Sequence, residues 1–253
     1  ELTGIDVVNE FRVRDVAEGG QGAPLVPVFH GAMTHGLARP LAVLNIGGVA
    51  NVTWIGTGPD GADRLVAFDT GPGNALLDDW TLRHTGEPLD RDGALARAGR
   101  VDETVLASLL ADPYFDRPAP KSLDRDAFRA DAVDGLAPAD GAATLVAFTA
   151  AAVARAAVHF PAPATRWLVT GGGRRNPAMM AELARRLEAP VAPVEEIGWD
   201  GDALEAQAFA YLAVRSLKGL PLTLPSTTGA PRPLGGGRLH LRPANRPAAV
   251  AGV

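Results

Sequence analysis

The sequence predicts an α/β protein, because three apolar runs rich in β-forming residues each end in a glycine-rich turn, and two of these turns lead directly into a helical pattern. The runs cover residues 41–46, 65–68 and 167–170, and a second β-rich stretch, 49–55, follows the first turn. Of the 253 residues, 47% are hydrophobic, which is ordinary for a globular protein with a substantial core. The chain is therefore long enough for one large domain or two modest ones.

Composition excludes several classes of function. The chain has no cysteine, so it has neither disulfides nor thiolate metal sites, which fits a reducing compartment and a cytoplasmic location. A formal charge of -5 and the lack of a basic patch argue against a nucleic-acid partner. We find no apolar stretch long enough to cross a bilayer and no signal peptide, so we expect no membrane partner and a small-molecule ligand.

The elements follow in order along the chain. A short strand is predicted at 5–9, and the Gly47-Gly48 pair joins 41–46 and 49–55 as a hairpin. Helices are predicted from residue 75, over 142–160, from about Pro177 to Leu187, and over 202–212, with brief strands at 167–170 and 191–194. The stretch 81–138 reads as helical segments of an inserted lobe. Pro and Gly accumulate near the end, so 235–253 reads as a weakly ordered tail.

Asp69 lies where the apolar run 65–68 meets a turn containing Gly71, Gly73 and Asn74. A helix predicted from Ala75 would place this acid beside backbone amides at a helix N-terminus, where anionic groups are favoured. The pattern is consistent with a base next to a phosphate. The alternative is an ordinary strand-to-helix turn with Asp69 as its cap.

Two further glycine turns offer backbone to a ligand. The hairpin places Asn45, Gly47, Gly48 and Asn51 around one turn, and the run 167–170 ends at three glycines that precede Asn176. Glycine turns after strands are routine in α/β proteins, so each could be purely structural.

Charged residues near both ends are further candidates. Arg12, Arg14 and Asp15 precede a flexible glycine-rich stretch and suit a polar ligand, or they form a salt-bridged loop. Glu205 lies in the first turn of a predicted helix, where it caps or binds.

Taken together, these motifs resemble the anhydro-N-acetylmuramic acid kinase family nearly from end to end. The segments that carry the resemblance, in chain order, are Phe11-Arg12-Val13-Arg14-Asp15, Gly19-Gly20-Gln21-Gly22-Ala23-Pro24, Leu44-Asn45-Ile46-Gly47-Gly48-Val49-Ala50-Asn51, Phe68-Asp69-Thr70-Gly71-Pro72-Gly73-Asn74, Asp112-Pro113-Tyr114-Phe115 with Pro120-Lys121-Ser122, Thr170-Gly171-Gly172-Gly173-Arg174-Arg175-Asn176-Pro177 and Leu224-Pro225-Ser226-Thr227-Thr228-Gly229-Ala230.

The resemblance implies an actin/hexokinase-like, ribonuclease H-like fold with ATP in a cleft between two α/β domains. It implies that residues 1–39 are the remainder of the first domain with a sugar-side loop, and that 40–234 form the second domain. The implied reaction opens 1,6-anhydro-N-acetylmuramic acid with water and phosphorylates it to N-acetylmuramic acid 6-phosphate in cell-wall recycling. ATP and magnesium are the implied cofactors, and a homodimer is implied.

The resemblance also assigns roles. Asp69 would be the general base, while Arg12, Arg14, Asp15, Asn74 and Glu205 would meet the sugar. The nucleotide would be held by a larger set, namely Asn45, Gly47, Gly48, Asn51, Gly71, Gly73, Gly171, Gly172, Gly173 and Asn176. No metal ligands are implied.

Family members begin with a Gly-Thr-Ser-Met-Asp-Gly type phosphate loop, which this sequence does not contain. We therefore expect the first domain to be mostly missing and the chain alone to have weak or no kinase activity. A rival hypothesis is a nucleotide-binding regulatory protein of the same superfamily without turnover. A polyphosphate phosphatase of that superfamily is disfavoured by the lack of a basic groove.

Overall fold

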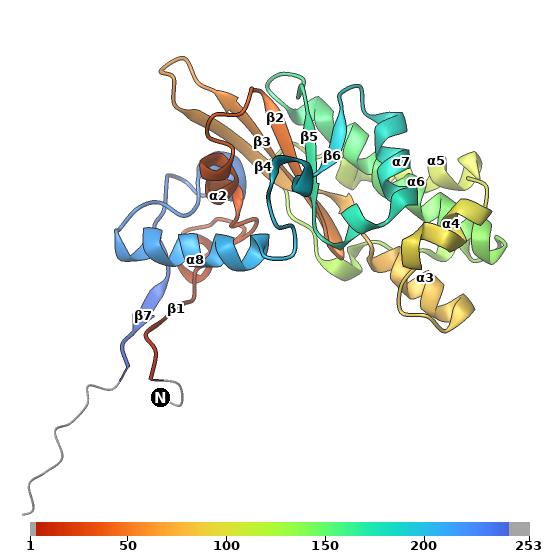
Figure 1. Ribbon diagram of the computed structural model, residues 1–253, viewed down its shortest axis with the longest axis horizontal. Helices are drawn as coiled ribbons and strands as arrows, with labels where there is room; N and C mark the ends of the chain where they lie inside the picture. The colour runs from red at the N-terminus through yellow and green to blue at the C-terminus, as the bar shows by residue number, and fades with distance from the viewer. Residues whose placement is uncertain (1–3, 243–253) are drawn as a thin grey trace, which may run out of the picture.

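The computed structural model describes residues 4–242, and a five-stranded mixed sheet forms its centre (Figure 1). The strands are β2 (Leu41–Ile46), β3 (Val49–Thr57), β4 (Asp63–Pro72), β5 (Trp167–Thr170) and β6 (Val191–Pro193). Their order is β4-β3-β2-β5-β6. β3 pairs antiparallel with β2 and β4, whereas β5 pairs parallel with β2 and β6. The predicted α/β class is confirmed, as is the Gly47-Gly48 hairpin.

β4 is longer than the sequence suggested. The strand was expected to end at Phe68, but it continues through Asp69 and the following glycine to Pro72. The register shifts opposite the Ala50–Asn51 step of β3, where Thr70 is the extra residue of a bulge in β4. Asp69 therefore lies inside a strand, and helix α3 (Ala75–Thr85) begins where predicted.

Five α-helices cover one face of the sheet, on the right in Figure 1. They are α3, α4 (Ala94–Ala98), α5 (Glu103–Leu110), α6 (Pro138–Ala156) and α7 (Pro177–Arg186). The apolar residues of the strands that face them include Leu44, Val52 and Phe68, all fully buried. α6 lies at the centre of this layer, because its small alanine side chains let α3, α4, α5, α7 and the sheet approach closely.

The expectation that no apolar stretch is long enough to cross a bilayer is wrong for α6. The helical stretch Pro138–His159 is long and apolar enough to cross a membrane by length and composition. However, 78% of its most apolar window is buried inside the protein, as in the core helix of a globular fold.

The opposite face of the sheet packs against α2 (Pro27–Met33) and α8 (Leu204–Leu217), on the left in Figure 1. Its core contains Leu41 and Val43 of β2, Ile55 of β3 and Leu212 of α8. Successive side chains of a strand point to opposite faces of the sheet, so alternate residues of each strand contribute to the two cores.

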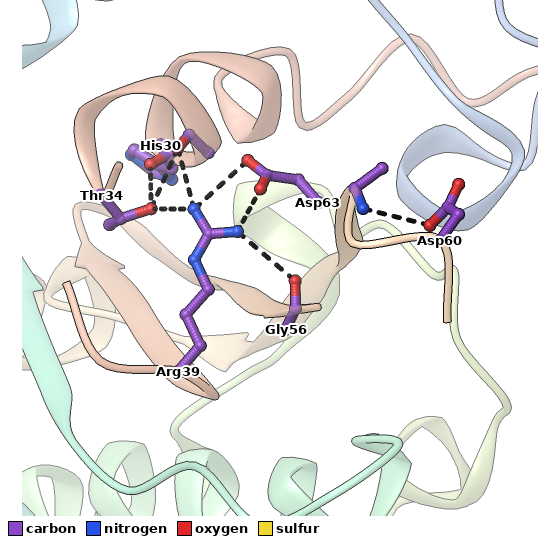
Figure 2. A network of polar contacts seen from close by, with 8 residues as sticks. His30, Thr34, Arg39, Gly56, Asp60 and Asp63 are labelled. Atoms are coloured by element: carbon purple, nitrogen blue, oxygen red, sulfur yellow. Dashed lines mark hydrogen bonds and ion pairs between the residues drawn. The ribbon is translucent and has the colours of Figure 1, made fainter. Parts of the chain in front are cut away.

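A polar network fixes α2 to the outer end of the β3–β4 hairpin (Figure 2). The guanidinium of Arg39 forms an ion pair with Asp63 and lies within hydrogen-bonding distance of the Gly56 carbonyl oxygen, 3.5 Å away. The Thr34 hydroxyl donates to the carbonyl oxygen of His30 at 2.8 Å. The His30 ring lies against Thr53 of β3, with 2.9 Å between Nδ1 and Oγ1.

The remaining elements are short. They are β1 (Val7–Asn9), α1 (Val13–Ala17), α9 (Pro225–Thr228), β7 (Arg238–His240) and seven 3₁₀ turns: η1 (Arg91–Gly93), η2 (Pro113–Asp116), η3 (Arg125–Ala127), η4 (Asp131–Val133), η5 (Ala157–His159), η6 (Gly172–Arg175) and η7 (Val194–Ile197). β1 and β7 form a two-stranded antiparallel sheet. The predicted tail 235–253 thus begins with an ordered strand, and its residues 243–253 lie outside the described part of the chain. The domain boundary at 39/40 remains a prediction.

Candidate functional site

Four adjacent strands each contribute a polar residue to one continuous row across the sheet. Asp69 of β4 lies opposite Asn51 of β3, Asn51 lies opposite Asn45 of β2, and Asn45 pairs with Thr170 of β5. By strand alternation these residues share the face that packs on α2 and α8. At a strand spacing of about 4.8 Å the row extends over roughly 14 Å. It lies at the carboxyl ends of the parallel strands β2 and β5, where α/β proteins commonly bind ligands.

Asp69 is held through both its backbone and its side chain. Its N–H donates to the Lys121 carbonyl oxygen at 2.9 Å, and its own carbonyl accepts from the Tyr114 hydroxyl at 2.6 Å. The Leu123 N–H donates to Oδ2 at 2.7 Å. The residue is only 7% exposed. One acid is thus fixed at three points.

The second carboxylate oxygen of Asp69 is free. Over residues 4–242 the side-chain polar atoms that are buried without a partner are Asn51 Oδ1 and Arg186 Nη2. Oδ1 of Asp69 has no hydrogen bond either, yet it is not among these atoms, so it remains in contact with solvent. Burial raises the pKa of Asp69 to about 6, opposed by the Leu123 N–H and the charge of Arg12, while Asp124 raises it further. Such a carboxyl can accept a proton near neutral pH.

The amides at the start of α3 are not open, contrary to the sequence prediction. Gly73 N–H and Ala75 N–H both donate to the Gly48 carbonyl oxygen, and Asn74 N–H donates to that of Gly47. A Cβ on Gly73 would lie 2.2 Å from the Gly47 carbonyl oxygen. The two turns therefore pack on each other, and these amides are already satisfied.

Two cavities flank Gly172. The first, of about 260 Å³, lies between β2, β5 and α8 and brings the predicted residues Asn45, Gly171, Gly172 and Glu205 together. The second, of about 350 Å³, lies beside α3 and is lined by Asn74, Gly172 and Asn176 among others. Asp69 lines neither cavity. Each cavity therefore combines predicted nucleotide residues with one predicted sugar residue, Glu205 in the first and Asn74 in the second.

The glycine turn after β5 needs its glycines for close packing. A Cβ on Gly171, whose φ is +77°, would lie 2.5 Å from Asn45 Oδ1, and one on Gly173 would lie 2.4 Å from the Ile46 side chain. Gly172 differs, because its nearest neighbour would be Asn74 Nδ2 at 3.5 Å. Gly172 is therefore the member of the turn with room for a ligand.

The charged candidates near the N-terminus have different surroundings. Asp15 is 1% exposed, and its carboxylate accepts from the hydroxyls of Thr223 and Thr228 at 2.5 and 2.7 Å and from Gly22 N–H at 2.7 Å. This internal bonding differs from the sugar contact expected for Asp15. Arg14 is exposed and pairs with Glu18, the salt-bridged alternative.

Arg12 and Glu205 remain available. Both are exposed, and neither side chain makes a hydrogen bond or ion pair within the described ranges. Arg12 is close enough to lower the pKa of Asp69, and Glu205 borders the first cavity. These positions are consistent with the predicted sugar side.

Sequence reasoning missed several residues of this site. Arg174 is 9% exposed and forms ion pairs with Glu195 and Asp202, which fix the turn after β5. Burial lowers the pKa of His30 to about 4, so this ring is a neutral wall of the first cavity. Burial, together with neighbouring acids, raises the pKa of Asp78 in the second cavity to about 6. No local pattern marked His30 or Asp78, whereas Arg174 lies inside a motif already quoted.

A buried acid on a polar row, with glycine turns at the carboxyl ends of two parallel strands, is an arrangement typical of α/β enzymes that bind small molecules. The family model described as "Anhydro-N-acetylmuramic acid kinase" matches residues 1–240. The chain belongs to this family, as the sequence resemblance predicted.

Curated relatives agree. Proteins named anhydro-N-acetylmuramic acid kinase from Rhodospirillum rubrum, Paramagnetospirillum magneticum and Acidiphilium cryptum are 66%, 64% and 61% identical, over 92%, 94% and 94% of this chain. The chain covers 62%, 67% and 65% of their respective lengths. It therefore spans about two thirds of the relatives it matches.

Among solved structures, a ligand-bound xylulose kinase from Lactobacillus acidophilus aligns at a TM-score of 0.42 and 15% identity. The alignment covers 71% of this chain and 39% of that one. This likeness is too low to support a conclusion.

Proposed function

We propose that this chain carries the general base of an ATP-dependent kinase that opens 1,6-anhydro-N-acetylmuramic acid and phosphorylates it to N-acetylmuramic acid 6-phosphate. The proposal depends chiefly on Asp69, a strand-held carboxyl with a raised pKa and one oxygen in contact with solvent. Membership of the kinase family supplies the substrate class.

Asp69 would take a proton from the water that attacks the anomeric carbon. The bond between that carbon and the bridging oxygen breaks, and the released 6-oxygen takes the γ-phosphoryl group, which leaves ADP. The ionised Asp69 is needed at the start of this step, and it ends protonated. Its free Oδ1 is the atom suited to this transfer, because Oδ2 is engaged with Leu123 N–H.

The nucleotide would lie across the two cavities that meet at Gly172. Asn45 and Gly171 border one cavity and Asn176 the other, which supports their predicted nucleotide role. Gly73 fits this role less well, because its N–H is bonded to Gly48 and its Cα faces the Gly47 carbonyl. We assign Gly47, Gly48, Gly71 and Gly73 to shaping the turns around the site.

Magnesium would enter with ATP. The described ranges contain no group of three or more His, Asp or Glu side chains that could hold a metal ion. The donor set instead fits Mg²⁺ bound mainly by phosphate and water, with the unbonded Asn51 Oδ1 as the protein oxygen on offer. Bound in this way, Mg²⁺ would neutralise charge on the transferred phosphoryl group.

Arg12, Arg14 and Glu205 are proposed for the sugar side, since a guanidinium suits the lactyl carboxylate of the sugar. Asn74 would have two roles. Its side chain donates a hydrogen bond to the Ile46 carbonyl oxygen at 3.2 Å, and the residue also lines the second cavity. A homodimer, a cytoplasmic location and a role in cell-wall recycling depend on the family resemblance alone.

The test compares Asp69→Asn with the wild-type protein, each fused behind a segment with the Gly-Thr-Ser-Met-Asp-Gly type loop. ADP release with 1,6-anhydro-N-acetylmuramic acid is expected to fall by about 10²- to 10⁴-fold, the usual contribution of a general base. ATP affinity should be unchanged. Asp60→Asn, at the far end of the β3–β4 hairpin, is the control. Equal turnover in Asp69→Asn and wild type overturns the proposal, and ATP binding without any turnover favours the regulatory alternative.

A further inference from the structure

Lys121 is a buried cation with no acidic partner. It is 2% exposed, and no carboxylate in residues 4–242 forms an ion pair with it. Its Nζ donates to the carbonyl oxygens of Tyr114 and Phe115, each at 3.1 Å. The ammonium also lies 4.8 Å from the ring centroid of Tyr114 and 5.8 Å from that of Phe68. Burying such a group is costly, so its retention needs a reason.

The backbone of Lys121 points the other way, toward Asp69. Its carbonyl oxygen accepts from Asp69 N–H at 2.9 Å. Two residues later, Leu123 N–H donates to the Asp69 carboxylate at 2.7 Å. Lys121 is therefore the link between the η2 turn and the strand that carries the acid.

Tyr114 of the η2 turn contacts both Lys121 and Asp69. Tyr114, whose carbonyl is held by the Lys121 ammonium, donates its own hydroxyl to the Asp69 carbonyl oxygen at 2.6 Å. Without the ammonium, two carbonyls in a buried site would lose their shared donor. The Lys121 side chain thus lies within the segment 114–123, whose two ends both donate hydrogen bonds to Asp69.

We propose that Lys121 is a positioning residue, whose ammonium clamps the segment 114–123 so that Leu123 N–H and the Tyr114 hydroxyl hold Asp69 in place. The relevance to catalysis depends on the proposed role of Asp69 as the base. The positioning itself does not depend on turnover. Lys121 does not contact substrate in this arrangement.

Other charged groups act on both ends of the clamp. Lys121 faces Arg117 and Asp116 of the η2 region, Arg155 of α6, and the His159 ring, whose Nε2 is 3.4 Å from Nζ. Burial is the main cause that lowers the pKa of Lys121 to about 8, with the two arginines adding to it. Asp69 faces Arg12, Asp124 and Tyr114. The amine remains largely charged at neutral pH.

The composition of the chain allows a chemical test. Lysine occurs at positions 121 and 218, and there is no cysteine. Lys121→Cys can be alkylated in the unfolded state with 2-bromoethylamine, which restores an amine of lysine length, or with 1-bromopropane, which gives an uncharged side chain of similar length. After refolding, the two products differ in the amine alone.

The readout is the Leu123 amide, followed by NMR. In the wild type and in the aminoethyl form its shift should titrate near pH 6 with Asp69. In the propyl form the titration should disappear, and hydrogen exchange at Leu123 should be about tenfold faster, as expected for the loss of one buried hydrogen bond. The Trp167 amide, bonded to the Pro190 carbonyl on β6's side of the sheet, is the internal control.

If the propyl form keeps the wild-type titration and exchange at Leu123, the proposal is overturned. Equal acceleration at Leu123 and Trp167 also overturns it, because the amine would then act on global stability. Lys121→Met, purified in its folded form, gives the same comparison where refolding fails. None of these measurements records turnover. A result against the positioning role of Lys121 is therefore distinct from a result against Asp69 as the base.

Discussion

Asn51 and Asp69 lie directly opposite each other on β3 and β4, and the side-chain oxygen of Asn51 is buried without a hydrogen-bond partner. An unpaired buried acceptor costs roughly 1–3 kcal/mol. Its position beside an acid with one free oxygen is consistent with the predicted ligand-binding role of Asn51.

Replacing Asn51 should therefore separate stability from function. We expect Asn51→Val to leave the free energy of unfolding unchanged or to raise it by about 1 kcal/mol, because a valine in a strand removes the unpaired oxygen. Turnover of the fused kinase should fall at least tenfold. Asn176→Val is the matched control, since Asn176 Oδ1 caps α7 through Ala178 and Met179 N–H and its loss should cost about 1 kcal/mol. A stability loss in Asn51→Val as large as in the control would contradict this view.

The raised pKa of Asp69 sets opposite pH dependences for activity and stability. The folded protein binds a proton at Asp69 up to about pH 6, whereas the ordinary value is 3.8. Between these values the folded state holds more protons than the unfolded state, so this contribution to stability is lost as pH rises. Only the ionised form accepts a proton, so kcat/KM should rise with pH and level off above about 6.

Urea unfolding and kcat/KM across this pH range check both trends. Asp69→Asn should flatten the stability change, and Asp78→Asn serves as the comparison, because the pKa of Asp78 is raised to a similar value in the second cavity. An acid limb of kcat/KM that follows Asp78 rather than Asp69 would reassign the base.

Asp15 should behave as a structural residue. Asp15→Ala removes the acceptor of three hydrogen bonds from Thr223, Thr228 and Gly22, so it should lower the free energy of unfolding by roughly 2–4 kcal/mol. Glu18→Ala, which breaks only partly exposed ion pairs, should cost less than about 1 kcal/mol. If Asp15→Ala instead keeps its stability and loses sugar affinity, the original sugar-side prediction is correct.

Gly73 should tolerate no side chain. In Gly73→Ala the new Cβ would meet the Gly47 carbonyl oxygen, so the turn must shift and the protein should lose roughly 1–3 kcal/mol of stability. Gly135→Ala, at an exposed position with open space, should change stability by less than about 0.5 kcal/mol. Urea titrations of both variants decide the point.

The sequence predicted the strands and main helices because their apolar periodicity and glycine turns are local signals. It placed the end of β4 too early, since a glycine inside a strand reads as a turn unless the pairing partner and its bulge are known. The same limit applies to Gly73: the sequence marks the turn but not the Gly48 carbonyl that occupies its amide.

For the site, the sequence identified Asp69, Asn45 and Asn51 but not the row they form, because register between strands is a tertiary property. The hydrogen bonds of Asp15 were not foreseen for the same reason: its partners Thr223 and Thr228 lie more than 200 residues away along the chain. Lys121 stood in a quoted motif, yet its burial depends on Tyr114 and Phe68 together.

The polar row limits the variation that the hairpin of β2 and β3 can accept. Asn45 and Asn51 point to the site only while their neighbours Leu44 and Val52 point to the opposite face, into the core beneath α6. A single residue inserted at the Gly47-Gly48 turn could shift the register of β2 or β3 by one position. The asparagine of the shifted strand would then face the core, among aliphatic side chains, and its aliphatic neighbour would face the site. The length of that turn is therefore constrained by folding and by chemistry at once, so natural or engineered variation should instead enter at the turn between β3 and β4, around Asp60.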